Sequence, residues 1–343
     1  MRKLLNVLYV TNPEAYLSRD GENVVVRVTE EEVARIPIHL LESIVAFNYI
    51  GMSPALMGLC AERKVTVSFL TEHGKFLATV HGPTSGNVLL RRQQYRLTED
   101  EETSGMVASW LVAAKIANCR AVLQRAIRDH GSSIDVEKLR RASQRLRDSL
   151  ERVAACTDLS VVRGIEGEAA SVYFACFNDL IVAQKEDFAM DGRSRRPPLD
   201  NMNAMLSFLY TLLTNDMKSA LETVGLDPAV GFLHRDRPGR PSLALDLIEE
   251  LRSYLVDRLA LSLVNRRQVS GKGFERRENR AIHMTADTRH TVISAWQRRK
   301  QDVITHPFLK EKIQIGLLPY VQALLMARYI RGDLDGYPPF FWQ

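Results

Sequence analysis

The chain has 343 residues, of which 45% are hydrophobic and 25% are charged, and its formal net charge is +5. This is the composition of an ordinary soluble globular protein, long enough for two domains and a sizeable core. The mild basic excess is consistent with a nucleic-acid partner. The four cysteines form no CxxC pair, which argues against a disulfide framework or a zinc cluster and favours a reducing compartment.

The first ten residues, MRKLLNVLYV, combine a basic start with an apolar run and raise the question of a signal peptide. The run contains Asn6 and ends at Thr11 and Asn12 without a small-residue cleavage site, so we predict a first strand instead. No stretch approaches the roughly 20 apolar residues that span a bilayer. We therefore expect a cytoplasmic protein.

Residues 1–80 are expected to form a small β-rich domain with one short helix. Gly21 follows an aspartate between two strand-like segments, which indicates a hairpin because glycine tolerates positive φ. The same signal recurs at His73 and Gly74. Between the two hairpins, Ser53 precedes a proline and is the expected N-cap of the helix.

Residues 81–90 are expected to form a linker, because HGPTSGN consists mostly of turn-forming residues. From residue 91 to residue 343 apolar positions recur with helical periods, so we predict a larger all-helical domain and the fold class α+β. Residues 1–90 hold 8 Lys+Arg and 9 Asp+Glu, whereas the remainder holds 38 and 32. The helical part therefore carries the basic excess, in clusters that favour phosphate contact when several lie on one domain.

A predicted helix over residues 161–181 places an acid on its apolar side. At 100° per residue Glu166 shares a face with Tyr173, whereas Glu168 points the opposite way. Burying an unpaired carboxylate is costly, so such a residue is normally paired, protonated or bound to a cation. The alternative is a frayed first turn in which Glu166 reaches solvent or pairs with Arg163.

The segment GFLHRDRPGRPSLALDLIEELR, residues 231–252, sets a histidine in a Gly- and Pro-rich turn before a helix with several carboxylates. Ser242 is the expected N-cap, and the apolar stripe begins at Ala244. The opposite side carries polar residues, which are Asp246, Glu249, Glu250, Ser253 and Asp257. Each feature has an ordinary explanation, because a solvated helix face looks like this and His234 alone is more often structural than a ligand.

Taken together, these segments offer carboxylates and an imidazole on a basic helical domain. This ligand set suits Mg²⁺ or Mn²⁺ with positions left open for a phosphate. The spacing alone lacks the compactness of an HExxH motif, in which one helix fixes the geometry locally. The sequence therefore yields a metal-site hypothesis beside the ordinary explanations.

Three motifs in this order resemble the CRISPR-associated adaptation integrase family, metal-dependent nucleases that insert new spacers into a repeat array. They are GIEGEAA, LDNMNAMLSFLYTLL and GFLHRDRPGRPSLALDLIEELR, and the ending KEKIQIGLLPYVQALLMARYIRGDLDGYPPFFW is similar to the type I-C branch. The resemblance covers essentially the whole chain, including its β-then-α order.

The resemblance implies a catalytic metal site formed by Glu166, His234 and Glu249, holding Mg²⁺ or Mn²⁺. The third position is often aspartate in the family and is glutamate here. Asp246 matches a second acidic position, which is expected to assist from the outer shell. In the implied reaction the 3′-hydroxyl of an incoming DNA fragment attacks a phosphodiester of the repeat, while water in its place gives endonuclease activity.

The resemblance also implies DNA contacts and partners. Expected DNA-binding residues on double-stranded or branched DNA are Asn203, Ser207, Tyr210, Arg235, Arg237 and Arg240, where arginine suits phosphate through its planar fork of donors. The family is expected to form a homodimer through the β domain, a heterohexamer with a small adaptation partner protein, and in type I-C systems an association with an iron–sulfur exonuclease. The PPFFW ending either docks on a partner or folds back on its own core.

Two other functions remain open from the sequence. A stand-alone nuclease acting on branched DNA would use the same metal site and the same basic domain. A non-catalytic DNA-binding scaffold would bind DNA without Glu166, His234 and Glu249 and would form no metal-dependent product, and an acid on an apolar helix face argues against it.

Overall fold

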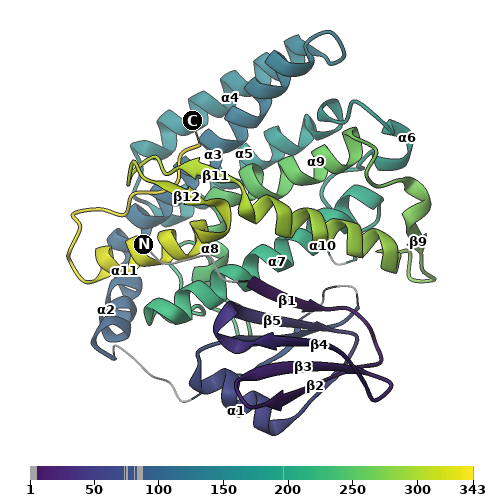
Figure 1. Ribbon diagram of the computed structural model, residues 1–343. Helices are drawn as coiled ribbons and strands as arrows, with labels where there is room; N and C mark the ends of the chain where they lie inside the picture. The colour runs from purple at the N-terminus through teal and green to yellow at the C-terminus, as the bar shows by residue number, and fades with distance from the viewer. Residues whose placement is uncertain are drawn as a thin grey trace. The chain divides into compact units, whose positions relative to one another are not determined.

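The computed structural model describes residues 6–72, 74, 76–80, 82, 88–195 and 197–342. Its contacts divide the chain into two compact units, Met1–Asn87 and Val88–Gln343 (Figure 1). The predicted linker residues 81 and 83–87, the turn residue His73 and the first five residues lie outside the described part. Helix α2 begins at Val88, three residues before the predicted start of the helical domain.

The first unit contains two four-stranded sheets. One has the order β1-β5-β7-β8, with strands Asn6–Val10, Leu41–Phe47, Thr66–Leu70 and Phe76–Val80; its first three strands are parallel and β8 is antiparallel to β7. The other has the order β4-β3-β2-β6, with strands Glu31–Pro37, Asn23–Val28, Ala15–Asp20 and Gly51–Met52. A short 3₁₀ helix η1, Ile38–Leu40, joins β4 to β5.

The predicted hairpins and helix of this unit are confirmed. β2 pairs with β3 across Gly21, whose φ is +58°, and β7 pairs with β8 across Gly74, whose φ is +82°. Helix α1, Pro54–Glu62, begins at Ser53, whose hydroxyl accepts a hydrogen bond from the backbone N–H of Leu56. One apolar core joins the two sheets and α1, so the unit buries its strands on a common interior.

The second unit is largely helical. Its helices are α2 (Val88–Glu99), α3 (Glu101–His130), α4 (Val136–Ala154), α5 (Leu159–Ala175), η2 (Phe177–Leu180), α6 (Lys185–Phe188), α7 (Asn201–Val224), α8 (Ser242–Leu251), the π-helical η3 (Arg252–Asp257), α9 (Arg258–Asn265), η4 (Gly271–Gly273), α10 (Ala286–Gln301), η5 (Ile315–Leu317) and α11 (Leu318–Ile330). Two short antiparallel pairs, β9 (Phe274–Arg276) with β10 (Ile282–Met284) and β11 (Val303–Thr305) with β12 (Lys312–Gln314), make the unit mixed rather than all-helical. The α+β class is confirmed.

Helix α3 is the central helix of this unit and packs against α4, α5 and α8 (Figure 1). Among the described helices, α3 has the length and hydropathy that a membrane-spanning helix would need, and 61% of its most apolar 18-residue stretch is buried inside the unit. A core helix passes the same test, because burial in protein and burial in lipid select the same side chains.

Helix α8 differs most from its predicted environment. The polar side was expected to be a solvated face, yet Asp246, Glu249 and Glu250 are at most 2% exposed, and so is Asp257 on η3. The solvated-face interpretation is therefore wrong: the helix is buried on all sides. Ser242 is the first residue of α8 rather than its N-cap, which is Pro241.

Candidate metal and nucleic-acid site

Glu166 lies in the second turn of α5, beyond any frayed end. Asp158 caps the helix by accepting hydrogen bonds from the backbone N–H groups of Ser160 and Val161. The Glu166 side chain is 28% exposed, and its carboxylate pairs with the ammonium of Lys115 on α3. Arg163, the alternative partner, instead donates its Nε–H to the Leu233 carbonyl at 2.7 Å.

The neighbouring acid on α5 behaves as its opposite position predicts. Glu168 is exposed and pairs with Arg152 at 2.8 Å. The helix therefore turns Glu166 inward and Glu168 outward. A charged partner inside the unit accounts for the burial of Glu166 at this place.

Glu249 on α8 faces the same ammonium. Its Oε2 lies 2.6 Å from Lys115 Nζ, and its Oε1 lies 2.7 Å from Arg252 Nη1. Burial alone would raise the pKa of Glu249, but the charges of Arg252, Lys115 and His234 lower it to about 2, so the carboxylate is ionised at neutral pH. Two acids from different helices thus meet at one cationic position.

Asp246 organises the turn that carries His234. Its fully buried carboxylate accepts hydrogen bonds from the backbone N–H groups of Phe232, Leu233 and His234 at 2.6, 2.9 and 3.0 Å. The imidazole Nδ1 of His234 lies 2.6 Å from Asp246 Oδ1. Because an ionised carboxylate only accepts, Nδ1 carries the proton, and in the neutral ring Nε2 keeps its lone pair.

Glycine is required at the start of this turn. A Cβ at Gly231 would lie 2.6 Å from Asp246 Oδ2 and 2.8 Å from the backbone nitrogen of Leu243. Only a residue without a side chain lets the turn pass so close to the first residues of α8. The GFLH motif is therefore explained by packing as well as by its histidine.

The donor set of this site fits a divalent cation. Glu249 Oε2 is buried and lies 2.6 Å from the Lys115 ammonium, so a positive charge already sits at this oxygen. Glu166, Glu249 and the outward imidazole nitrogen of His234 supply the oxygen and nitrogen donors that Mg²⁺ or Mn²⁺ accepts. Among the described residues, no three His, Cys, Asp or Glu side chains form a ready ligand group, and the Lys115 ammonium lies between the two acids. The donor types themselves fit Mg²⁺ or Mn²⁺.

The predicted DNA-binding residues of α7 gather around one arginine. The Arg193 guanidinium donates to Asn203 Oδ1 and to Ser207 Oγ, and lies 5.4 Å from the ring centre of Tyr210. Tyr210 in turn donates its hydroxyl to Asp257 at 2.5 Å. Asn203 has no exposed surface, and its side-chain oxygen holds the Arg193 guanidinium.

The three loop arginines lie apart from this cluster, directly after the histidine. Arg235 and Arg237 are exposed, Arg240 is half-buried, and within the described part of the chain none of them forms an ion pair. Burial and the neighbouring charge of Arg235 lower the pKa of Arg163, which places a fourth guanidinium close to this loop. An unpaired basic loop beside the site is consistent with phosphate contact.

The C-terminal segment, residues 337–342, folds back on its own core. Tyr337 donates its hydroxyl to Glu250 Oε1 at 2.6 Å, and the Phe340 N–H donates to Glu250 Oε2 at 2.6 Å. Asn118 Nδ2 donates to the carbonyls of Glu250 and Phe340, and the Trp342 N–H donates to Asn118 Oδ1. The segment therefore ties α3 and α8 together behind Glu249.

Sequence reasoning missed Lys115, Arg252, Asn118 and Arg193. One signal was available, since Lys115 is the only charged residue between Glu102 and Arg120. A lone cation in an apolar helical run needs an acidic partner elsewhere. No periodicity could identify that partner.

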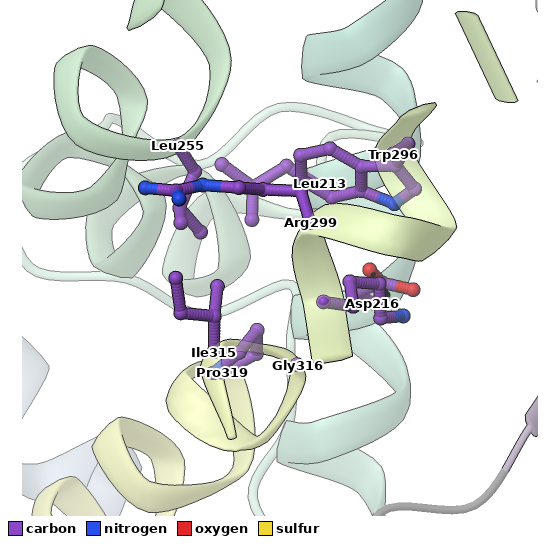
Figure 2. A pocket seen from close by; sticks show the side chains of 9 residues that line it. Leu213, Asp216, Leu255, Trp296, Arg299, Ile315, Gly316 and Pro319 are labelled. Atoms are coloured by element: carbon purple, nitrogen blue, oxygen red, sulfur yellow. Dashed lines mark hydrogen bonds and ion pairs between the residues drawn. The ribbon is translucent and has the colours of Figure 1, made fainter. Parts of the chain in front are cut away.

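A pocket elsewhere in the unit contains none of the predicted site residues (Figure 2). It lies between α7, α10 and the start of α11 and is lined by Leu213, Asp216, Leu255, Trp296, Arg299, Lys300, Ile315, Gly316 and Pro319. The buried pair formed by Asp216 and Lys300, 2.9 Å apart, closes one side of it. The acids that meet at Lys115 are outside this pocket.

Comparison with known proteins identifies the family. The family model described as CRISPR associated protein Cas1 matches residues 8–298. The chain belongs to the Cas1 family. A protein of Chlorobaculum tepidum named CRISPR-associated endonuclease Cas1 1 is 52% identical over 343 residues, which is all of both chains, and one of Rhodospirillum rubrum named CRISPR-associated endonuclease Cas1 2 is 52% identical over 347 residues and equally complete.

A longer relative joins the family to a second protein. A CRISPR-associated exonuclease Cas4/endonuclease Cas1 fusion of Geobacter sulfurreducens is 34% identical over 336 residues, covering 97% of this chain and 60% of the fusion.

Solved structures share the fold at lower identity. A casposase bound to integration product has a TM-score of 0.83 at 23% identity and covers 97% of this chain and 92% of its own. A CAS1 protein from Thermotoga maritima has a TM-score of 0.81 at 20% identity, covering 98% and 100%. A Cas6-RT-Cas1–Cas2 complex has a TM-score of 0.85 at 21% identity, covering 99% and 36%. The order of a β-rich unit followed by a helical unit is therefore that of Cas1 structures.

Proposed function

We propose that this protein is a divalent-metal-dependent DNA endonuclease and integrase that inserts short foreign DNA fragments into a CRISPR repeat array. The observation that carries the proposal is the meeting of Glu166 and Glu249, from two separate helices, at one cationic position. Family membership and the endonuclease names of the relatives that are 52% identical supply the class of reaction.

Glu166, Glu249 and His234 would hold the cation, with Mg²⁺ or Mn²⁺ as the expected ion. A bound divalent cation would stabilise the negative charge that develops on the phosphate and orient the attacking oxygen. Asp246 fixes the tautomer and the direction of the His234 ring, the usual task of a carboxylate behind a histidine ligand. No general-base role is assigned to Glu166, because a carboxylate engaged with a cation is a poor base.

In the proposed reaction a DNA 3′-hydroxyl oxygen bonds to phosphorus of a repeat phosphodiester while one of the two ester bonds from that phosphorus to the repeat strand breaks. The displaced strand end leaves as a hydroxyl, so the proton lost by the attacking hydroxyl is balanced by the one gained there. One phosphodiester replaces another, so no nucleotide triphosphate is consumed. Arg235, Arg237 and Arg240 would contact backbone phosphates beside this centre, and Ser207, Tyr210 and Arg193 would support the strand. Such contacts position DNA without reading its sequence.

The proposed assembly follows from relatives. A solved complex contains Cas1 with Cas2, and a curated relative fuses Cas4 to Cas1, so we propose a small Cas2-like partner and a Cas4-like exonuclease as partners of this chain. A homodimer through residues 1–80, a heterohexamer with the partner, type I-C membership and a cytoplasmic location belong to the same proposal.

The test is strand transfer of a labelled short duplex with free 3′-hydroxyls into a repeat-containing plasmid, with Mn²⁺ and the small partner protein. Glu166→Ala should reduce joining by at least about 100-fold, the scale of removing an electrostatic contact at a reacting centre. Glu168→Ala is the matched control, because Glu168 lies two residues away on the same helix, is exposed and pairs only with Arg152 among the described residues.

Three outcomes decide between the candidate functions. Joining that disappears in Glu166→Ala while DNA binding and the fold persist supports the integrase. Nicking of branched DNA without joining favours the stand-alone nuclease. Joining that persists in Glu166→Ala removes this site from the chemistry, and metal-independent binding without any product favours a scaffold.

A further inference from the structure

Lys115 is the group at which the two acids of the site meet. Its Nζ lies 2.6 Å from Glu249 Oε2 and also contacts Glu166 Oε1. The side chain is 11% exposed and leaves α3 between the buried residues Ala114 and Ile116.

The two carboxylates hold the ammonium inside the unit by charge. A buried lysine paired with two acids in this way is their counter-ion.

The charges around the acids are already balanced. Glu166 and Glu249 face Lys115 and Arg252, which makes two negative and two positive groups. A divalent cation on the same carboxylate oxygens would add two further positive charges unless one cation withdrew. Arg252 is bound to Glu249 Oε1, whereas the Lys115 ammonium faces Glu249 Oε2 and also Glu166 Oε1, between the two acids. Lys115 is therefore the group that the ion would replace.

We propose that Lys115 is the shared counter-ion of Glu166 and Glu249, and that a divalent cation binds by displacing its ammonium from these two carboxylates. This inference rests on the metal chemistry of the proposed function. Lys115 acts as a positioning residue, because it keeps the two acids together before the ion arrives. It also weakens the affinity for the ion, since the ion must compete with it.

The first experiment measures Mn²⁺ affinity from the electron paramagnetic resonance signal of free Mn²⁺, in the full-length protein without DNA. Lys115→Gln should bind Mn²⁺ at least about tenfold more tightly than the wild type, within the 5- to 150-fold range of couplings between sites. Lys115→Arg retains the charge, so its Mn²⁺ affinity should stay within about threefold of the wild-type affinity, which is less than the smallest of those couplings. Lys300→Gln is the matched control, because Lys300 is also buried and paired with an acid, Asp216, but lies at the separate pocket.

The second experiment uses the wild type alone and so does not depend on the folding of a variant. Reductive methylation followed by mass spectrometry measures the reactivity of each lysine with and without Mn²⁺. Mn²⁺ should raise the labelling of Lys115, because the displaced ammonium loses its carboxylate partners, and should leave Lys300 unchanged.

The failures of the inference and of the proposed function are distinguishable. If the wild type and a folded Lys115→Gln both bind no Mn²⁺, the proposed metal site is wrong. If the wild type binds Mn²⁺ but a folded Lys115→Gln binds it no more tightly, or if Mn²⁺ leaves the labelling of Lys115 unchanged, the displacement is wrong and the proposed function stands.

Discussion

Asp246→Asn tests whether the turn that carries His234 depends on one buried carboxylate. The two oxygens of Asp246 accept four hydrogen bonds, three from backbone N–H groups and one from the His234 ring. Asparagine keeps one oxygen and replaces the other by an NH₂ group that faces two N–H donors. With the NH₂ at the Oδ2 position, the N–H groups of Phe232 and Leu233 lose their acceptor; with it at the Oδ1 position, the N–H of His234 loses its acceptor and the ring must change tautomer.

The expected cost follows from the one or two donors left without an acceptor. Leaving a buried donor unsatisfied costs about 1–3 kcal/mol, so Asp246→Asn should lower the free energy of unfolding by about 1–6 kcal/mol. A loss of this size is a large share of the stability of an ordinary protein, which is about 5–15 kcal/mol. Because the His234 ring would lose the carboxylate that orients it, Mn²⁺ binding should also weaken about 10- to 100-fold, the usual effect of removing a hydrogen-bond partner of a metal ligand.

Urea unfolding followed by tryptophan fluorescence measures this cost in the correct part of the chain. The three tryptophans, Trp110, Trp296 and Trp342, all belong to the helical unit. Asp236→Asn is the control, since Asp236 lies in the same loop but is exposed, and it should change stability by no more than about 0.5 kcal/mol. If the free energy of unfolding of Asp246→Asn lies within about 1 kcal/mol of the wild-type value, the cost expected for unsatisfied donors is absent and the reasoning is refuted.

Three further changes test neighbouring features. Gly231→Ala should destabilise the helical unit and weaken Mn²⁺ binding, because its Cβ would lie 2.6 Å from Asp246 Oδ2; equal thermal unfolding of variant and wild type would contradict this. Tyr337→Phe should cost about 1–3 kcal/mol in urea unfolding by leaving Glu250 short of a donor, whereas Tyr49→Phe at an exposed position should cost nothing measurable. Burial raises the pKa of Asp257 to about 6, partly offset by the Tyr210 hydrogen bond, so the native state binds the proton more tightly than the unfolded state does. The stability that this proton contributes is complete below the unfolded pKa of 3.8 and is lost as pH rises through 6. Between pH 5 and pH 7 the free energy of unfolding of the wild type should therefore fall by about 1 kcal/mol relative to that of Asp257→Asn. Parallel pH profiles of the two proteins would contradict the assignment.

Local turn chemistry was sufficient to predict much of the β-rich unit. Gly21 and Gly74 adopt the positive φ that their hairpins need, and Ser53 caps the helix that it precedes. The parallel pairing of β1 with β5 and of β5 with β7 could not be predicted in the same way. Those pairs join strands distant in the chain, and no local residue pattern records which strand lies beside which.

The environment of α8 shows where periodicity fails. Acids on one side of a helix look identical in sequence whether that side faces water or buried partners. The partners of Glu249 and Glu250 come from positions as distant as Lys115 and Tyr337. The face of Glu166 was predicted correctly, because its apolar neighbours lie on the same helix, but its partner was not, because Lys115 lies on another.

The buried acids of α8 and η3 explain why one helix organises the whole site. Asp246 binds the turn of His234, Glu249 binds Lys115 and Arg252, and Glu250 binds the C-terminal segment. Burying each of these acids is unfavourable unless its own partners are in place, so the helix has its full stability only when every one of those segments has docked. The acids of α8 are therefore held in place by contacts within the unit. In the displacement proposed above only the Lys115 ammonium would leave, and neither the turn of His234 nor the C-terminal segment would lose a contact.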